Sequence, residues 1–181
     1  TEGEATMENA EAFLKGKRLL IVDDEPDILE TLEEMLDMCS IDSAPDFATA
    51  EKFLNKNQYD AAILDIMGVR GYDLLEKCTE KGIPALMLTA HALSPDNLVK
   101  SIRRGAHSYV PKDKIADIAD YAAEVIEAAK AGKQSESRWF QRLKPFFDRK
   151  FGPGWQEADE EFWKSFDESY VPSRNELDNM L

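Results

Sequence analysis

The stretch KRLLIVDDEP, at residues 17–26, decides the fold. Its first part, residues 17–22, is a short apolar run that ends in acids, as a strand buried in a parallel sheet does. Pro26 follows the acids and suits the first turn of a helix. The stretch therefore predicts a buried strand, an acidic turn and a helix, in that order.

The same pattern of apolar run and helical spacing recurs along the next hundred residues. Further strands are predicted at residues 41–44, 60–65, 83–88 and 107–110. Helices are predicted at residues 26–39, 47–56, 72–81, 95–104 and 115–131. Because strand and helix alternate, the chain is predicted to be an α/β protein with a parallel sheet and helices on both faces. In such sheets the functional site lies at the carboxyl ends of the strands.

Composition excludes several classes of protein. The chain has 181 residues and a formal net charge of -14, which disfavours non-specific binding to nucleic acid or to an anionic membrane. No apolar run approaches ~18 residues, the length of a membrane-spanning helix. The acidic start, TEGEATMENAEAF, has no apolar core of a signal peptide, so a cytoplasmic location is expected. Cys39 and Cys78 are expected as free thiols, with a disulfide as the less favoured alternative.

Polar side chains follow the predicted strands. Asp23 and Asp24 come after the first strand, Asp65 after the third, Thr89 after the fourth and Lys112 after the fifth. The fold brings these groups into one crevice, where ionised carboxylates would repel each other. A hard divalent cation relieves that repulsion, and Mg²⁺ commonly binds one or two carboxylates, waters and a phosphate. The strand ends therefore predict a magnesium site.

The same groups suit phosphoryl transfer to a carboxylate. Asp65 can attack phosphorus, Lys112 and the cation can neutralise the phosphoryl oxygens, and Thr89 can donate a hydrogen bond. Each residue alone has a structural explanation: helix capping for the acidic pair, a turn for Thr89 and a solvated surface for Lys112. Their order at successive strand ends favours the functional interpretation.

These motifs resemble the receiver domain of bacterial two-component response regulators. The resemblance covers residues 17–131 and implies a flavodoxin-like, doubly wound, five-stranded sheet of order 2-1-3-4-5. The matching motifs are LLIVDDEPDILETL at 19–32, AAILDI at 61–66, PALMLTA at 84–90 and GAHSYVPK at 105–112.

The resemblance also implies a metal site and a signalling role. Asp65 would be the phosphoacceptor, Asp24 the main Mg²⁺ ligand and Asp23 a ligand acting through a metal-bound water. The backbone carbonyl of Met67 would complete the metal site. The phosphoryl donor would be a sensor histidine kinase or a phosphotransfer protein.

Three further residues take roles from the resemblance. Thr89 and Lys112 would bind the phosphoryl oxygens. Tyr109 would turn inward when Thr89 moves toward the phosphoryl group. This change would remodel the surface of the fourth helix, fifth strand and fifth helix, through which the protein would contact a downstream protein or a second copy of itself.

The sequence departs from the family at two places. Val69 stands where the family usually has Pro, and Gly71 follows Asp65 by six residues where the family usually has a Gly eight residues on, so the loop is predicted to be two residues shorter. Pro111 precedes Lys112, whereas the family commonly has Pro after the lysine. An edge strand tolerates Pro at this position, so Lys112 keeps its predicted role.

The chain ends in a segment without a family match. The predicted organisation is a polar leader at 1–16, a receiver at 17–131 and an aromatic-rich helical extension at 132–181, with a hinge at 132–137. We interpret the extension as a helical hairpin that packs on the receiver or on itself; the alternative is a binding or dimerising surface controlled by phosphorylation. A DNA-binding output domain is disfavoured because no helix-turn-helix pattern is evident.

Two other functions remain as alternatives. A phosphatase of the haloacid-dehalogenase type also uses a strand-end Asp, but it requires a second Asp where this chain has Met67. A degenerate receiver would act as a scaffold without phosphate, and the intact Asp24, Asp65, Thr89 and Lys112 disfavour it. The chain is therefore predicted to be a signalling protein that catalyses only its own phosphorylation and dephosphorylation.

Overall fold

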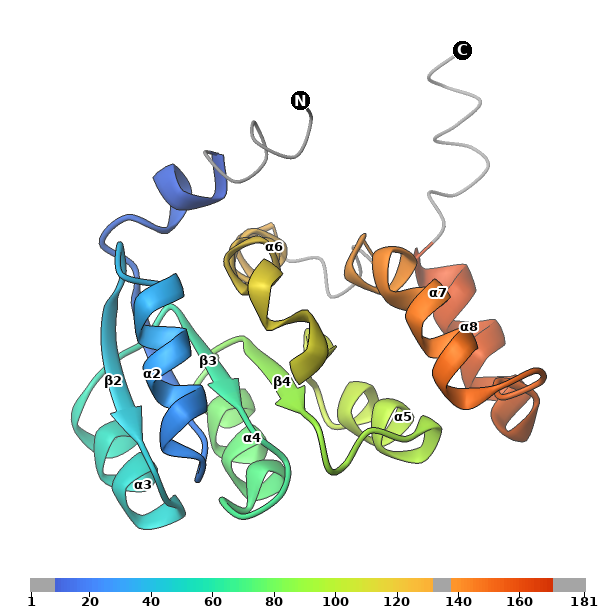
Figure 1. Ribbon diagram of the computed structural model, residues 1–181, viewed down its shortest axis with the longest axis horizontal. Helices are drawn as coiled ribbons and strands as arrows, with labels where there is room; N and C mark the ends of the chain where they lie inside the picture. Colours follow the sequence, from blue (N-terminus) through green and yellow to red (C-terminus); the bar gives the residue numbers. More distant parts are fainter. Residues whose placement is uncertain (1–8, 132–137, 171–181) are drawn as a thin grey trace.

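The computed structural model describes residues 9–131 and 138–170. Five parallel strands form one sheet of order β2-β1-β3-β4-β5, which confirms the predicted fold (Figure 1). The strands are β1 (Arg18–Val22), β2 (Ser40–Ala44), β3 (Ala61–Leu64), β4 (Ala85–Thr89) and β5 (Ser108–Pro111). The predicted hinge at 132–137 lies outside the described residues.

Helices connect the strands and cover both faces of the sheet. They are α2 (Pro26–Met35), α3 (Phe47–Lys56), α4 (Gly71–Glu80), α5 (Pro95–Arg103), the 3-10 helix η1 (Lys112–Asp117) and α6 (Ile118–Lys130). Helices α2 and α6 lie together on one face, and α3, α4 and α5 lie on the other (Figure 1). Two of these helices begin at a capping side chain: Asp46 accepts from the Thr49 amide at 2.7 Å, and Ser94 accepts from the Asn97 amide at 3.1 Å.

The register of the central strands sets the position of the site. Val22 of β1 pairs with Leu64 of β3, so the residues that follow them, Asp23 and Asp65, emerge side by side. All four residues of β3 are buried, as expected for a strand between two helical layers. The predicted acidic turn and the third strand end therefore meet at one edge of the sheet.

Some predicted boundaries differ from the structure. Helix α2 ends at Met35, four residues before the predicted end at 39, and residues 36–39 form a turn closed by the Cys39 amide on the Leu36 carbonyl at 2.9 Å. The first three residues of the last predicted helix, 115–117, belong to the 3-10 helix η1, and α6 begins only at Ile118. The end of the polar leader, residues 9–14, is helical and buries Leu14 completely.

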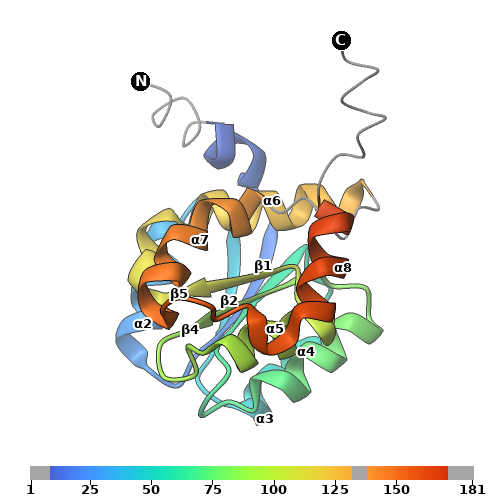
Figure 2. The same ribbon diagram turned by 90° about the vertical axis from the view of Figure 1, so that its right-hand side faces the viewer.

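The C-terminal hairpin consists of α7 (Arg138–Phe151), the 3-10 helix η2 (Glu157–Asp159) and α8 (Glu160–Tyr170). Its two long helices lie over the β5 edge of the sheet, and α7 contacts both β5 and α6 (Figure 2). The hairpin packs on the receiver and also on itself: Phe140 stacks on Trp163 of α8 with ring centroids 5.1 Å apart. This is the helical hairpin that the aromatic spacing predicts.

Candidate functional site

The carboxyl ends of β1 and β3 carry a cluster of acids. Asp23 and Asp65 are buried, with exposed fractions of 1% and 3%, whereas Asp24 is exposed and Glu25 is half-buried. One carboxylate oxygen from each of these four residues lies within 4.8 Å of the others. The structure therefore brings together the three acids predicted from the sequence and adds Glu25.

Lys112 neutralises part of this charge. Its ammonium Nζ lies 2.8 Å from Asp23 Oδ2, 3.0 Å from Glu25 Oε1 and 3.2 Å from Asp65 Oδ2. The lysine follows β5 directly, and η1 begins at this residue, so its side chain enters the site from the edge of the sheet. The predicted convergence of Asp23, Asp65 and Lys112 is thus present in the structure.

Burial and neighbouring charges shift the pKa values of several groups in the cluster. Burial raises the pKa of Asp23 and of Asp65, and the Asp23 charge raises the pKa of Asp65 further. For Lys112, burial alone disfavours the charged form, but hydrogen bonds to Asp23 and Glu25 raise its pKa above the ordinary value. One lysine therefore faces an excess of carboxylates, and additional positive charge would relieve the site.

Asp65 is held in a fixed orientation by both of its oxygens. Oδ1 accepts a hydrogen bond from the Ile66 amide at 2.8 Å, and Oδ2 accepts one from Lys112 at 3.2 Å. These two bonds aim the carboxylate toward the acid cluster and away from the sheet. A carboxylate held in this way is a suitable nucleophile for an incoming phosphorus atom.

The loop after Asp65, residues 66–70, is closed by a glycine. The Gly71 amide donates to the Ile66 carbonyl at 3.1 Å, and a Cβ added at Gly71 would lie 2.0 Å from the backbone oxygen of Asp65. Val69, which stands at the family's Pro position, is completely buried, and Arg70 adopts left-handed angles with φ of 55°. The first residue of α4 therefore lies tightly against the Asp65 backbone.

The acid cluster has the ligands that Mg²⁺ prefers, because its donors are carboxylate oxygens at the mouth of a crevice. Asp24 supplies an exposed carboxylate, and a Cβ added at Gly68 would lie 2.3 Å from its Oδ2. The backbone at Gly68 therefore lies close to this carboxylate. Glu25 is not among the predicted ligands; its place directly after the acidic pair is the only sequence signal for it.

Thr89 is the last residue of β4, Tyr109 lies in β5, and both side chains are completely buried. Thr89 Oγ1 accepts from the Ala92 amide at 3.2 Å. The Tyr109 hydroxyl donates to the Ala92 carbonyl at 2.8 Å and accepts from the Ser94 amide at 3.2 Å. The two predicted switch residues are thus joined through Ala92, and the Tyr109 side chain is turned inward.

Comparison with known proteins gives a consistent picture. The family model "Response regulator receiver domain" matches residues 19–123. The chain is 30% identical over 142 residues to the two-component response regulator ARR10 of Arabidopsis thaliana, covering 74% of this chain and 26% of that protein. It is 33% identical over 101 residues to the response regulator GtcR of Aneurinibacillus migulanus, covering 53% of this chain and 41% of that protein. The chain thus spans less than half the length of these relatives.

Solved structures show the same similarity. A CheY-like response regulator receiver domain protein from Methanospirillum hungatei is 27% identical with a TM-score of 0.59, covering 65% of this chain and 98% of that one. NtrX from Brucella abortus is 28% identical with a TM-score of 0.58, covering 66% of this chain and 28% of that one. Within residues 9–131 and 138–170, no helix is both long and apolar enough to cross a membrane.

Proposed function

The chain belongs to the response regulator receiver domain family of two-component signalling, and we propose that it carries its signal as a phosphoryl group on Asp65. The observation that supports this proposal is the geometry of Asp65. Its carboxylate is buried at the end of β3, oriented by the Ile66 amide and paired with Lys112. Asp23 has a similar arrangement, because its Oδ1 accepts from the Glu25 amide and its Oδ2 pairs with Lys112. The choice of Asp65 therefore also rests on its place in the AAILDI motif at 61–66, which resembles the family's phosphoacceptor motif.

The proposed reaction is transfer from a phosphohistidine of a sensor histidine kinase or phosphotransfer protein. An Asp65 oxygen forms a bond to phosphorus while the bond from phosphorus to the imidazole nitrogen breaks, and the imidazole keeps the electron pair. Lys112 then pairs with a phosphoryl oxygen, and the Thr89 hydroxyl donates to another. Hydrolysis of the acyl phosphate by water returns the carboxylate and inorganic phosphate.

Asp23, Asp24 and Asp65, with the Met67 carbonyl, would hold a Mg²⁺ ion in this site. When bound, the ion supplies positive charge that offsets the charge of the phosphoryl oxygens. The protein's own contribution is positional: it keeps the Asp65 oxygens fixed and the Lys112 ammonium within reach of them. We assign the chain no catalytic activity other than transfer onto and off Asp65.

We further propose that residues 17–131 form the receiver unit of a cytoplasmic protein that signals through contacts with a downstream protein or a second copy of itself. The net charge of -14 disfavours direct binding to nucleic acid.

Intact mass spectrometry tests the assignment of Asp65. With acetyl phosphate and Mg²⁺, the wild-type chain should gain about 80 Da, the mass of one phosphoryl group. The variant Asp65→Asn should gain nothing, whereas Asp27→Asn, at an exposed acid in the first turn of α2, should behave as wild type. An equal adduct on Asp65→Asn would show that another residue is the acceptor.

A further inference from the structure

The hairpin covers the switch tyrosine. Phe147 of α7 lies with its ring centroid 6.1 Å from that of Tyr109, and both side chains are completely buried. Figure 2 shows α7 lying across β5, the strand that carries Tyr109. The inward position of Tyr109 and the docked position of the hairpin are therefore parts of the same packing arrangement.

A path of contacts joins this packing to Thr89, at the end of the strand next to the one that precedes Asp65. Thr89 ends β4 beside β3, whose last residue precedes Asp65. Thr89 Oγ1 accepts from the Ala92 amide, and the Ala92 carbonyl accepts from the Tyr109 hydroxyl. The Tyr109 ring then contacts Phe147. The steps from Thr89 to Tyr109 are hydrogen bonds and the step from Tyr109 to Phe147 is a ring contact, whereas Asp65 and Thr89 are related by the pairing of their strands.

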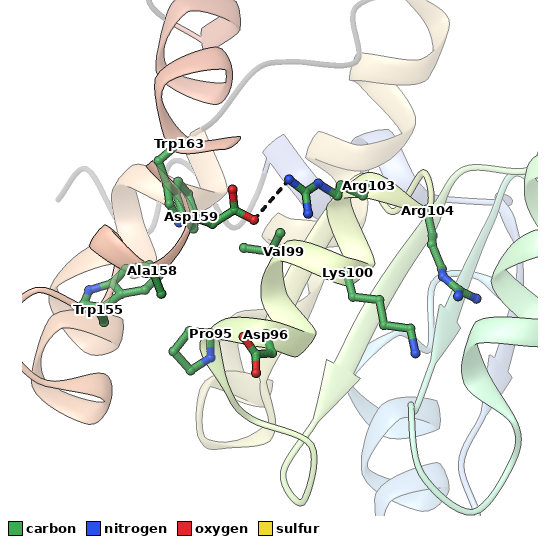
Figure 3. A pocket seen from close by; sticks show the side chains of 10 residues that line it. All are labelled: Pro95, Asp96, Val99, Lys100, Arg103, Arg104, Trp155, Ala158, Asp159 and Trp163. Atoms are coloured by element: carbon green, nitrogen blue, oxygen red, sulfur yellow. Dashed lines mark ion pairs between the residues drawn. The ribbon is translucent and has the colours of Figure 1, made fainter. Parts of the chain in front are cut away.

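The rim of the hairpin interface is polar. Arg142 of α7 pairs with Glu124 of α6 and lies over the Tyr121 ring, 4.8 Å from its centroid. On the other side, Arg103 of α5 pairs with Asp159 at 3.0 Å, as Figure 3 shows. The groove of Figure 3 runs between α5 and the η2–α8 region and has tryptophans on the hairpin side. The interface thus spans α5, β5 and α6.

We propose that the C-terminal hairpin is an intramolecular ligand of the α5-β5-α6 surface and that phosphorylation of Asp65 tightens its docking. The inference rests on the proposed function. The Thr89 oxygen uses a lone pair to accept from Ala92, so its hydroxyl proton is free to donate to a phosphoryl oxygen. That bond would fix the position of Thr89, and through it that of Ala92, and so keep the Tyr109 hydroxyl bonded inward.

The coupling must act in both directions. An outward Tyr109 would leave the space beside Phe147 unfilled, so the docked hairpin selects the inward ring. Because linkage is reciprocal, a phosphoryl group that favours the inward ring favours docking by the same factor. Coupling between sites in one protein is typically about 5- to 150-fold, which sets the expected size of the effect.

Hydrogen exchange on the full chain tests the proposal. Exchange of the amides in α7 is followed with and without acetyl phosphate and Mg²⁺, and intact mass is recorded on the same samples. We expect phosphorylation to slow exchange in α7 by at least about fivefold. An adduct on Asp65 without slower exchange overturns the inference and leaves the proposed function standing, whereas the absence of any adduct overturns both.

Two variants separate docking from coupling. Tyr109→Phe removes the hydroxyl that reaches Ala92 but keeps the ring against Phe147; it should keep the hairpin docked and lose the response to phosphorylation. Phe147→Ala should speed α7 exchange in both states. Lys150→Ala, at an exposed position of the same helix, should match wild type. A full response in Tyr109→Phe would contradict the proposed path.

Discussion

The acid cluster around Lys112 and the C-terminal hairpin both contain buried side chains, but they are held together by opposite kinds of interaction. In the cluster, Lys112 shares its charge among Asp23, Glu25 and Asp65, and an excess of negative charge remains. In the hairpin, Phe140 is surrounded by rings, including Phe166 with a centroid 5.0 Å away. A site with unbalanced charge responds strongly to an added ion or phosphoryl group, whereas an apolar cluster responds only to a change of shape.

Tyr109 is the residue at which these two kinds of interaction meet. Its hydroxyl belongs to the polar path from Thr89, and its ring belongs to the aromatic packing of Phe147. Added charge at Asp65 can therefore act on the hairpin through a change in the position of the Tyr109 ring. The comparison predicts that the cluster is sensitive to cations and salt and that the hairpin is not.

Removal of Lys112 should have the largest effect. Lys112→Ala leaves buried carboxylates without a partner, and such a loss typically costs about 3–5 kcal/mol of unfolding free energy. Urea unfolding should show this loss, and Mg²⁺ should restore part of it by supplying the missing charge. Lys52→Ala, at an exposed lysine of α3, should change stability by less than about 0.5 kcal/mol. Equal stability of the two variants would mean that the attraction between Lys112 and the carboxylates does not stabilise the fold.

The second-largest effect is expected from a substitution in the tight loop after Asp65. A Cβ at Gly71 would lie 2.0 Å from the Asp65 backbone oxygen, so Gly71→Ala must displace the backbone that carries the proposed acceptor. We expect a loss of about 1–3 kcal/mol in stability, as for overpacking, together with slower phosphorylation by acetyl phosphate. Gly82→Ala is the matched control: its φ is +72°, and a Cβ there meets nothing within 4 Å.

That control should cost about 1–2 kcal/mol from left-handed strain and leave the rate of phosphorylation unchanged. Phosphorylation of Gly71→Ala at the wild-type rate would show that the position of the loop does not limit the reaction.

Sequence reasoning located the strand-end groups because their position depends on local pattern and parallel register. Asp23 and Asp65 follow strands that pair side by side, so their convergence follows from the order of the strands. The contact of Gly71 with the Asp65 backbone depends on the path of one short loop, which residue type alone does not specify. The contact of Phe147 with Tyr109 joins parts of the chain that are distant in sequence. The spacing of the aromatic residues predicts a hairpin, but it does not indicate which rings come into contact.

The third-largest effect is expected on Mg²⁺ binding, when the main predicted metal ligand is removed. Asp24→Ala should weaken Mg²⁺ binding by at least about tenfold, because it deletes an exposed carboxylate at the mouth of the cluster. Asp23→Ala should weaken binding less, since a water can partly replace an outer ligand. Titration with Mg²⁺ followed by tryptophan fluorescence or calorimetry measures both variants. Equal affinity for Asp24→Ala and wild type would remove Asp24 from the metal site.

The polar rim of the hairpin should give the smallest effect. Arg103 and Asp159 form a 3.0 Å ion pair, but their side chains are 55% and 30% exposed, so water and salt screen the attraction. Arg103 also lies over the Phe162 ring, and single variants would therefore mix two contacts. A double-mutant cycle with Arg103→Ala and Asp159→Ala isolates the ion pair. Thermal unfolding should give a coupling below about 1 kcal/mol that shrinks as salt is raised. A coupling above about 2 kcal/mol that does not change with salt would mean that charge holds the hairpin on the receiver, and the contrast between the two regions would fail.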